Sequence, residues 1–204
     1  PLPALDIGEN ILEVTVPIGR RTNLENFYLL GDFGVHVNGT LKTITAPVRR
    51  LGFGDIVSQG LPFYTGNLLY KFQVQTTKPG LTIRAPRYRG GLIKVFVDGV
   101  DRGNIIYSPY TLHLPEIEAG THEVTLRLYG TRYNGFAQLH HVQGVYFYQS
   151  PNSWRSEGDL WCYEYQFKPA GILKSPEIYN GGHFIQPNGS IREVRAQAHI
   201  SDRS

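Results

Sequence analysis

Apolar and polar residues alternate with a period of two along most of the chain. In residues 68–75 the even positions are all apolar, and three of the four odd positions are polar. Four further segments alternate in the same way and stop at or near Gly, Pro, Asn or Asp, namely 81–85, 93–97, 124–128 and 161–167. This period predicts short strands with one buried face, which is typical of an antiparallel sandwich.

Turn chemistry supports the same architecture. Asp98-Gly99 follows the apolar run 92–97, and glycine accepts positive φ at no steric cost, so these residues predict a tight hairpin. Asn38-Gly39 predicts a second hairpin. Before residue 60 the pattern predicts four strands at the following positions: 11–17, 26–30, 35–38 and 41–46.

The predicted fold is all-β, an antiparallel β-sandwich with a small N-terminal β unit. No segment of ten residues shows helical spacing with caps, and 23 glycines and 13 prolines interrupt the chain too often for long helices. We divide the chain into a small β unit or set of linker strands (1–59), the sandwich (60–178) and a polar C-terminal tail (179–204). The tail is expected to pack on the surface or to pair with the N-terminal strands.

Composition narrows the classes of partner. Lys and Arg number 20 against 17 Asp and Glu, and the basic residues are scattered, so nucleic-acid binding is not expected. No apolar run approaches the roughly 20 residues that span a bilayer, so no membrane partner is expected. Cys162 is the only cysteine, which excludes an intrachain disulfide. The start of the chain has no signal-peptide pattern, and the chain reads as a domain cut from a longer protein of open cellular location.

Several motifs, in their order, carry a family resemblance. Residues 95–103 read V-F-V-D-G-V-D-R-G, residues 107–110 read Y-S-P-Y, and residues 120–126 read G-T-H-E-V-T-L. Together, segment 68–128 resembles the sugar-binding domain of family-two glycoside hydrolases. Asp98 stands where that family usually has asparagine, and a tight turn accepts either residue.

The flanking segments extend this resemblance. Residues 29–35, 60–66, 130–135 and 163–171 are similar to the C-terminal region of large bacterial glycosidases, including α-L-rhamnosidase-like ones. The resemblance covers residues 26–178 and implies a galactose-binding-like jelly roll whose catalytic domain lies upstream. It implies no cofactor, although some galactose-binding-like folds hold a structural calcium ion under the first strands, and this point stays open.

Catalysis by the chain itself is not expected. A glycosidase needs two facing carboxylates, and the acidic residues here fall mostly beside Gly or Pro in turns. His140-His141 is not expected to bind a metal, since adjacent strand residues point to opposite faces and no third ligand lies at a suitable spacing.

Sugar binding would use aromatic rings and polar side chains in loops, because pyranose rings stack on aromatics and their hydroxyls take hydrogen bonds. The candidate carbohydrate-binding residues are Tyr64, Arg132, Asn134, His140, His141 and Trp154. The competing interpretation is that the aromatics fill a seam with the upstream domain and that the Asn and His hold a loop in shape. We therefore expect a non-catalytic accessory domain of a bacterial glycoside hydrolase, a structural buttress with weak carbohydrate binding. The alternatives are an independent carbohydrate-binding module and, third, a self-contained glycosidase.

Overall fold

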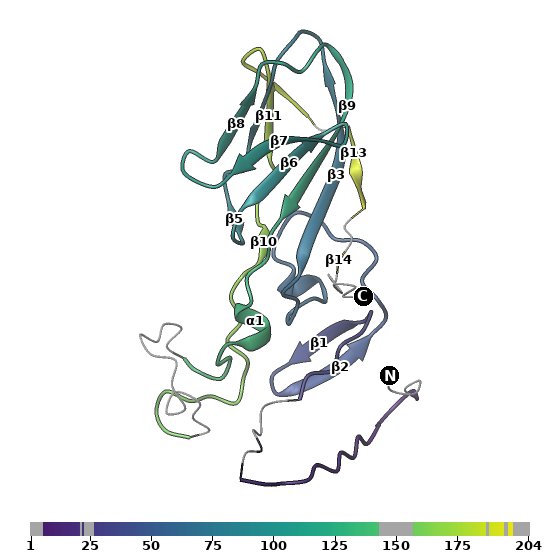
Figure 1. The fold of residues 1–204 in the computed structure, drawn as a ribbon, viewed down its shortest axis with the longest axis vertical. Helices are drawn as coiled ribbons and strands as arrows, with labels where there is room; N and C mark the ends of the chain where they lie inside the picture. Colours follow the sequence, from purple (N-terminus) through teal and green to yellow (C-terminus); the bar gives the residue numbers. More distant parts are fainter. Residues whose placement is uncertain are drawn as a thin grey trace. The chain divides into compact units, whose positions relative to one another are not determined.

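The computed structural model describes residues 6–20, 22, 27–142, 157–186, 188–193 and 196–197. By contacts the chain forms two compact units, Pro1–Gly31 and Asp32–Ser204. The described part of the second unit contains fourteen β-strands, one 3₁₀ turn (η1, Val57–Gln59) and one four-residue helix (α1, Tyr133–Phe136), so the predicted all-β class is confirmed (Figure 1). Within the described residues, no helix has the length and apolar character needed to cross a membrane.

The larger sheet is built around the longest strand. Its order is β13-β3-β9-β6-β7, and β14 also pairs with β3. The strands are β3 (Asn67–Thr76), β6 (Ile93–Val97), β7 (Val100–Ile105), β9 (Gly120–Leu128), β13 (Asn188–Glu193) and β14 (Ala196–Gln197), and every pair is antiparallel. The even positions of 68–74 are buried, as the alternation predicts.

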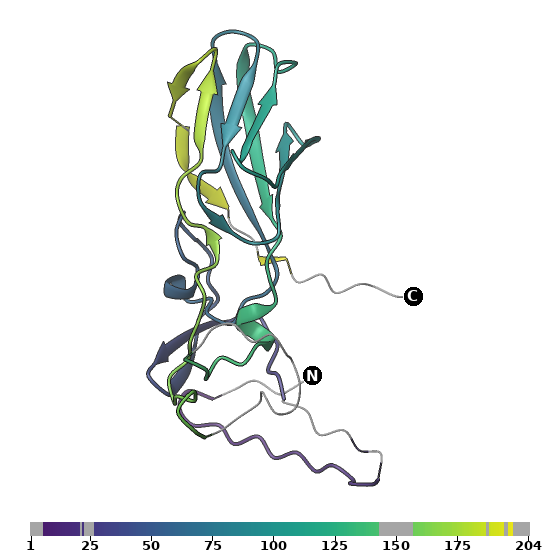
Figure 2. The same cartoon turned by 90° about the vertical axis from the view of Figure 1, so that its left-hand side faces the viewer.

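A second sheet lies against the first and makes the other layer of the sandwich (Figure 2). Its order is β12-β11-β4-β8, with β4 (Leu81–Arg84), β8 (Thr111–Leu114), β11 (Glu177–Asn180) and β12 (His183–Ile185). Two small sheets complete the fold, β5 (Tyr88–Arg89) with β10 (Gly171–Ile172), and β1 (Gly34–Asn38) with β2 (Leu41–Thr45).

The core lies between the two large sheets. One apolar cluster joins their inner faces, with these fully buried members among others: Leu68, Tyr70, Val74, Leu81, Ile83, Ile93, Val95, Leu126, Leu128 and Ile178. Tyr70 brings a polar atom into this core, and its hydroxyl accepts a hydrogen bond of 3.2 Å from the Ile172 N–H of β10. Burial raises the pKa of Tyr70. The observed architecture is a β-sandwich, and its jelly-roll, galactose-binding-like character stays a prediction.

Both predicted hairpins form. Val97 pairs with Val100 across Asp98 and Gly99, whose φ values of 52° and 79° are the left-handed pair that a tight β-turn requires. The β1–β2 hairpin turns at Gly39 and Thr40, one residue later than the dipeptide that predicted it.

Three predicted strands are wrong. The segment 11–17 has no strand partner among the described residues, and Ile11 is 90 % exposed. The described part of 26–30 is irregular as well. Residues 161–167 form only an isolated bridge, His141 with Trp161. In each case the sequence pattern indicated an extended chain, but a strand also requires a neighbouring backbone to take its hydrogen bonds.

The C-terminal segment contributes to both sheets. β12 pairs with β11, while β13 and β14 pair with β3, so the described residues beyond 179 are hydrogen-bonded into the sandwich. The domain boundaries at 59 and 178 stay predictions.

Candidate functional site

Most of the predicted sugar-binding residues lie in loops beyond the ends of β3 and β9. Tyr64 precedes β3, Asn134 lies in α1 with Arg132 just before it, and His140 and His141 follow α1. Trp154 lies outside the described residues.

Asn134 is a clamp between two distant segments. It is 4 % exposed, its Nδ2 donates to the Lys168 carbonyl (2.8 Å), and its Oδ1 accepts from the Lys168 N–H (3.0 Å). Both ends of the Asn134 side-chain amide are therefore hydrogen-bonded to the backbone of one residue, Lys168. Arg132 is exposed, and its carbonyl accepts the Phe136 N–H of the helical turn (3.0 Å).

Tyr64 packs against the core rather than into solvent. Its hydroxyl donates to the Asn67 carbonyl (2.9 Å), and burial raises the pKa of Tyr64 to about 12. A side chain at position 66 would collide with the Tyr64 ring, which explains the glycine there. The Tyr64 phenol is thus a structural group that closes the turn into β3.

His140 and His141 separate, as adjacent residues of an extended chain should. His141 is buried and pairs with Trp161 in the isolated bridge. The His140 Nδ1 donates to the Cys162 carbonyl (3.0 Å), and the Cys162 N–H donates back to the His140 carbonyl (2.8 Å). The two histidines therefore tie residues 140–141 to 161–162.

These contacts surround an aromatic cluster, which we define as Phe63, His140, Trp161, Tyr163, Tyr165 and Phe167. His140 lies 4.4 Å from the Tyr165 ring centre, and Trp161 meets Tyr163 edge to face at 4.3 Å and 79°. Phe63 meets Tyr165 and Phe167 edge to face at 5.2 and 5.0 Å. Such pairs add about 0.5 to 1.5 kcal/mol each beyond their buried area.

The β1–β2 hairpin contributes a cation to this cluster. The Lys42 Nζ lies 5.2 Å from the Tyr165 ring centre and donates to its hydroxyl (3.1 Å). The sequence analysis missed Lys42, Tyr163, Tyr165 and Phe167 as site residues. The alternating aromatics of 161–167 were the available signal, but they were interpreted as a strand.

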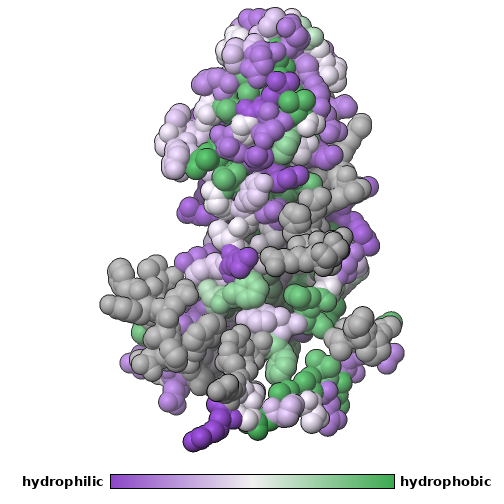
Figure 3. Space-filling model, viewed as in Figure 1, coloured by the Kyte–Doolittle hydropathy of each residue, from purple (hydrophilic) through white to green (hydrophobic). Residues whose placement is uncertain are grey.

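Apolar side chains remain exposed around the aromatic cluster. We call Ile44, Val142 and Tyr163 the exposed apolar set, and their exposed fractions are 44 %, 52 % and 72 %. By contrast, the sandwich face in view in Figure 3 is mostly hydrophilic, with small hydrophobic groups between. Exposed apolar groups that gather at one end of a domain mark an interaction surface more often than scattered ones do.

A shallow pocket of about 440 Å³ lies between β1, η1 and Phe167. Its polar lining consists of His36, Thr45, Asp55 and Ser58, and valines, a proline and Phe167 supply the apolar lining. The Asp55 Oδ1 accepts from the Val57 and Ala170 N–H groups (3.1 and 3.0 Å). Within the part of the chain that the structure describes, no group of three His, Cys, Asp or Glu side chains has the spacing of a metal site.

Comparisons with known proteins assign no family to the chain. No family model matches the chain, and no curated protein matches it. Among solved structures, the chain is similar to a rhamnosidase from Novosphingobium sp. PP1Y, with a TM-score of 0.43 and 19 % sequence identity. The similarity covers 80 % of this chain and 16 % of that chain.

Proposed function

We propose that this chain is a non-catalytic accessory domain of a carbohydrate-active protein, and that it supports a neighbouring domain through the exposed apolar set. The resemblance of residues 26–178 to glycosidase accessory regions motivates the protein class. One observation carries the structural role. The polar atoms of the predicted sugar-binding residues Tyr64, Asn134 and His140 are hydrogen-bonded to backbone groups of this chain. Val142 and Tyr163, which follow His141 and Cys162 in the sequence, stay exposed.

The packing of the rings supports this role over a sugar platform. A pyranose stacks on an open ring face, whereas Phe63 meets its partners Tyr165 and Phe167 edge to face. Much of the ring surface in the aromatic cluster is therefore in contact with other rings of the same cluster. The other rings of the cluster support the exposed Tyr163, and Tyr165 also contacts Lys42 of the β1–β2 hairpin. A two-stranded sheet is marginally stable alone, so this hairpin needs such contacts.

Burial of the exposed apolar set would favour association. Full burial of a large apolar side chain contributes about 1.5 to 3 kcal/mol. Interfaces between domains of one chain are commonly about 600 to 1,500 Å² and mix apolar with polar groups. Three exposed apolar side chains beside Lys42 and His36 fit that composition.

Hydrogen exchange tests the supporting role. We would compare the 204-residue chain alone with the longer polypeptide that contains it, and follow amides of β2 and of 160–165. Slower exchange there in the longer polypeptide, with unchanged exchange in β7, is the expected result. Equal exchange in both proteins would refute the role.

A matched pair of variants sharpens this test. Tyr163→Asp should detach the domain from its neighbour in the longer polypeptide and increase protease cleavage between them. Tyr107→Asp changes a tyrosine that is also highly exposed, 82 %, but lies in the β7–β8 loop, and should have no such effect. Equal cleavage in the two variants would contradict the assignment of the surface.

The pocket beside β1 favours carbohydrate binding as a second candidate function. Its volume lies within the usual range for small-molecule sites, and its lining offers hydroxyl, imidazole and carboxylate groups beside an aromatic ring. Calorimetry with plant and mucin oligosaccharides tests this candidate, with His36→Ala and Ser58→Ala in the pocket lining as variants and Tyr107→Ala as control. Binding lost only in the first two variants supports it, and no binding at millimolar sugar refutes it.

A further inference from the structure

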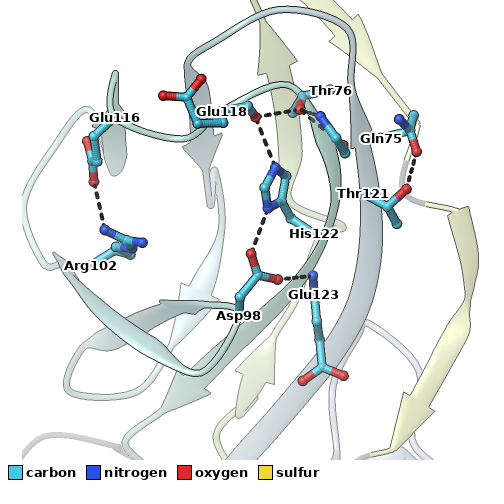
Figure 4. Close-up of polar contacts among 10 residues, drawn as sticks. Gln75, Thr76, Asp98, Arg102, Glu116, Glu118, Thr121, His122 and Glu123 are labelled. Atoms are coloured by element: carbon cyan, nitrogen blue, oxygen red, sulfur yellow. Dashed lines mark hydrogen bonds and ion pairs between the residues drawn. The ribbon is translucent and has the colours of Figure 1, made fainter.

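A histidine in β9 connects two loops of the sandwich (Figure 4). The His122 Nδ1 lies 2.7 Å from the Asp98 Oδ2 in the β6–β7 turn, and its Nε2 lies 3.0 Å from the Glu118 carbonyl in the β8–β9 loop. The His122 side chain is 14 % exposed. Both ring nitrogens therefore face oxygen atoms, and the ring is largely shielded from solvent.

The chemistry of these two oxygens decides the protonation of the ring. A carbonyl only accepts hydrogen bonds, and an ionised carboxylate likewise only accepts. A neutral imidazole carries one N–H, so it can satisfy one of the two and must turn a lone pair toward the other. Only the imidazolium donates to both, and the geometry therefore selects the charged ring.

Asp98 is held in place independently of the histidine. Its Oδ1 accepts the Glu123 N–H (2.8 Å), and its own N–H donates to the Glu123 carbonyl (2.9 Å). These bonds are made by the backbone of β9 and do not depend on the ring's charge. The β6–β7 turn is thus a fixed anchor for the carboxylate.

The Glu118 side of the contact is held less firmly. Its carbonyl also accepts from the buried Thr76 hydroxyl (3.0 Å), but the same hydroxyl lies 3.1 Å from the Gly120 carbonyl. One hydroxyl proton cannot serve both carbonyls at once. The His122 N–H is therefore the donor that holds the Glu118 carbonyl continuously.

Two other charged side chains near His122 are each paired with a side chain of opposite charge. Arg102 of β7 opposes the imidazolium, but it lies 3.6 Å from the Glu116 carboxylate of the β8–β9 loop. On β9 itself, Glu123 is paired with Lys71 of β3 (3.6 Å). Across the sheet, the β3 residue opposite His122 is the uncharged Val74. Asp98 is thus the charge that His122 meets directly.

We propose that His122 is a pH-operated latch, which in its charged form joins the β6–β7 turn to the β8–β9 loop and on deprotonation releases the Glu118 carbonyl of that loop. The neutral ring keeps its Nδ1–H toward the anchored Asp98 and turns an Nε2 lone pair toward the Glu118 carbonyl. The proton goes to solvent, and no covalent bond changes. Among the described residues, the Glu118 carbonyl then keeps only the Thr76 hydroxyl as its donor, while the Gly80 N–H still donates to the Ile117 carbonyl (2.7 Å) and the Gly120 N–H to the Thr76 hydroxyl (2.9 Å).

The pKa values of His122 and Asp98 are shifted in the directions that the latch requires. The hydrogen bond with Asp98 raises the pKa of His122 above its ordinary 6.5, against a smaller lowering by burial. The same bond lowers the pKa of Asp98 below its ordinary 3.8. The latch is consequently closed on the acidic side of the raised His122 pKa and opens as the pH rises through it.

Nuclear magnetic resonance of the full chain tests the latch. Imidazole ¹⁵N shifts should show both His122 nitrogens protonated at pH 6.5, with a titration midpoint shifted upward from that of the urea-unfolded chain. Across that midpoint, amide exchange of Glu118 and Gly120 should gain speed beyond the intrinsic base-catalysed rate. A midpoint at or below the unfolded value, or no extra loss of protection, would overturn the proposal.

A variant separates the latch from general pH effects. Asp98→Asn keeps a residue that tolerates the left-handed turn but removes the carboxylate. It should return the His122 midpoint to the unfolded value and abolish the pH-dependent loss of protection. Glu123→Gln removes a nearby carboxylate outside the latch and should change neither. If the His122 titration midpoint of Asp98→Asn equals that of the unsubstituted protein, the proposal is overturned.

Discussion

Replacing Asn134 with alanine tests whether this residue is a structural clamp. The change removes the two hydrogen bonds to the backbone N–H and C=O of Lys168, which link segments that lie 34 residues apart. A typical net hydrogen bond contributes about 1 kcal/mol, and a buried group left without its partner costs about 1 to 3 kcal/mol. Lys168 is itself exposed, so water would recover part of this loss. We therefore expect a decrease of about 2 to 3 kcal/mol in the free energy of unfolding.

Urea unfolding followed by two probes measures this effect. Far-ultraviolet circular dichroism reports on the sandwich, and tryptophan fluorescence includes Trp161 of the aromatic cluster. Arg132→Ala, in the same loop but with an exposed side chain, is the control and should stay within about 0.5 kcal/mol of the parent. If the cluster opens before the sandwich, the two transitions will separate. A loss below about 1 kcal/mol by both probes would refute the clamp.

Three further predictions concern the sandwich. Tyr70→Phe should cost about 1 to 3 kcal/mol in urea unfolding, because the buried Ile172 N–H loses its acceptor; an unchanged midpoint would contradict this. Gly99→Ala should cost about 1 to 2 kcal/mol, because φ at this position is 79°, and a neutral result would show that the turn relaxes. The free energy of unfolding, measured against pH, should include the full stabilisation by the His122–Asp98 pair between about pH 4 and 6.5. These limits are the ordinary pKa values of the two groups in the unfolded chain. The stabilisation should be lost as pH falls through the lowered Asp98 pKa and as pH rises through the raised His122 pKa, and His122→Gln should flatten the profile.

The sandwich could be predicted because its signals are local. In β3 the burial of alternating residues fixes which face is inward, and at Asp98-Gly99 only residues that accept positive φ fit a two-residue turn. Alternation alone was insufficient at 11–17 and 161–167. In the second segment the aromatic rings pack on one another, which produces the same period without a neighbouring strand.

The roles of the site residues could not be predicted, since they depend on partners far away in sequence. Asn134 and His140 have the side chains of sugar-binding residues, and nothing in the surrounding sequence shows that Lys168 and Cys162 occupy them. In the sequence, His122 stood out only as one member of the motif 120–126 that carries the family resemblance. Its contact with Asp98 depends on the register of β6 against β9, which places Val97 opposite Val124.

The pairing of β3 with β13 and β14 has a consequence for synthesis on the ribosome. Among the described residues, one edge of β3 pairs with β13 and β14 alone, so the strand has this neighbour only after more than a hundred further residues have been translated. During that interval β3 presents unpaired backbone groups and an apolar face, which is a combination that promotes aggregation. A nascent chain of this protein should therefore depend on chaperones until β13 and β14 emerge. Expression of a chain that stops before Asn188 should yield insoluble protein.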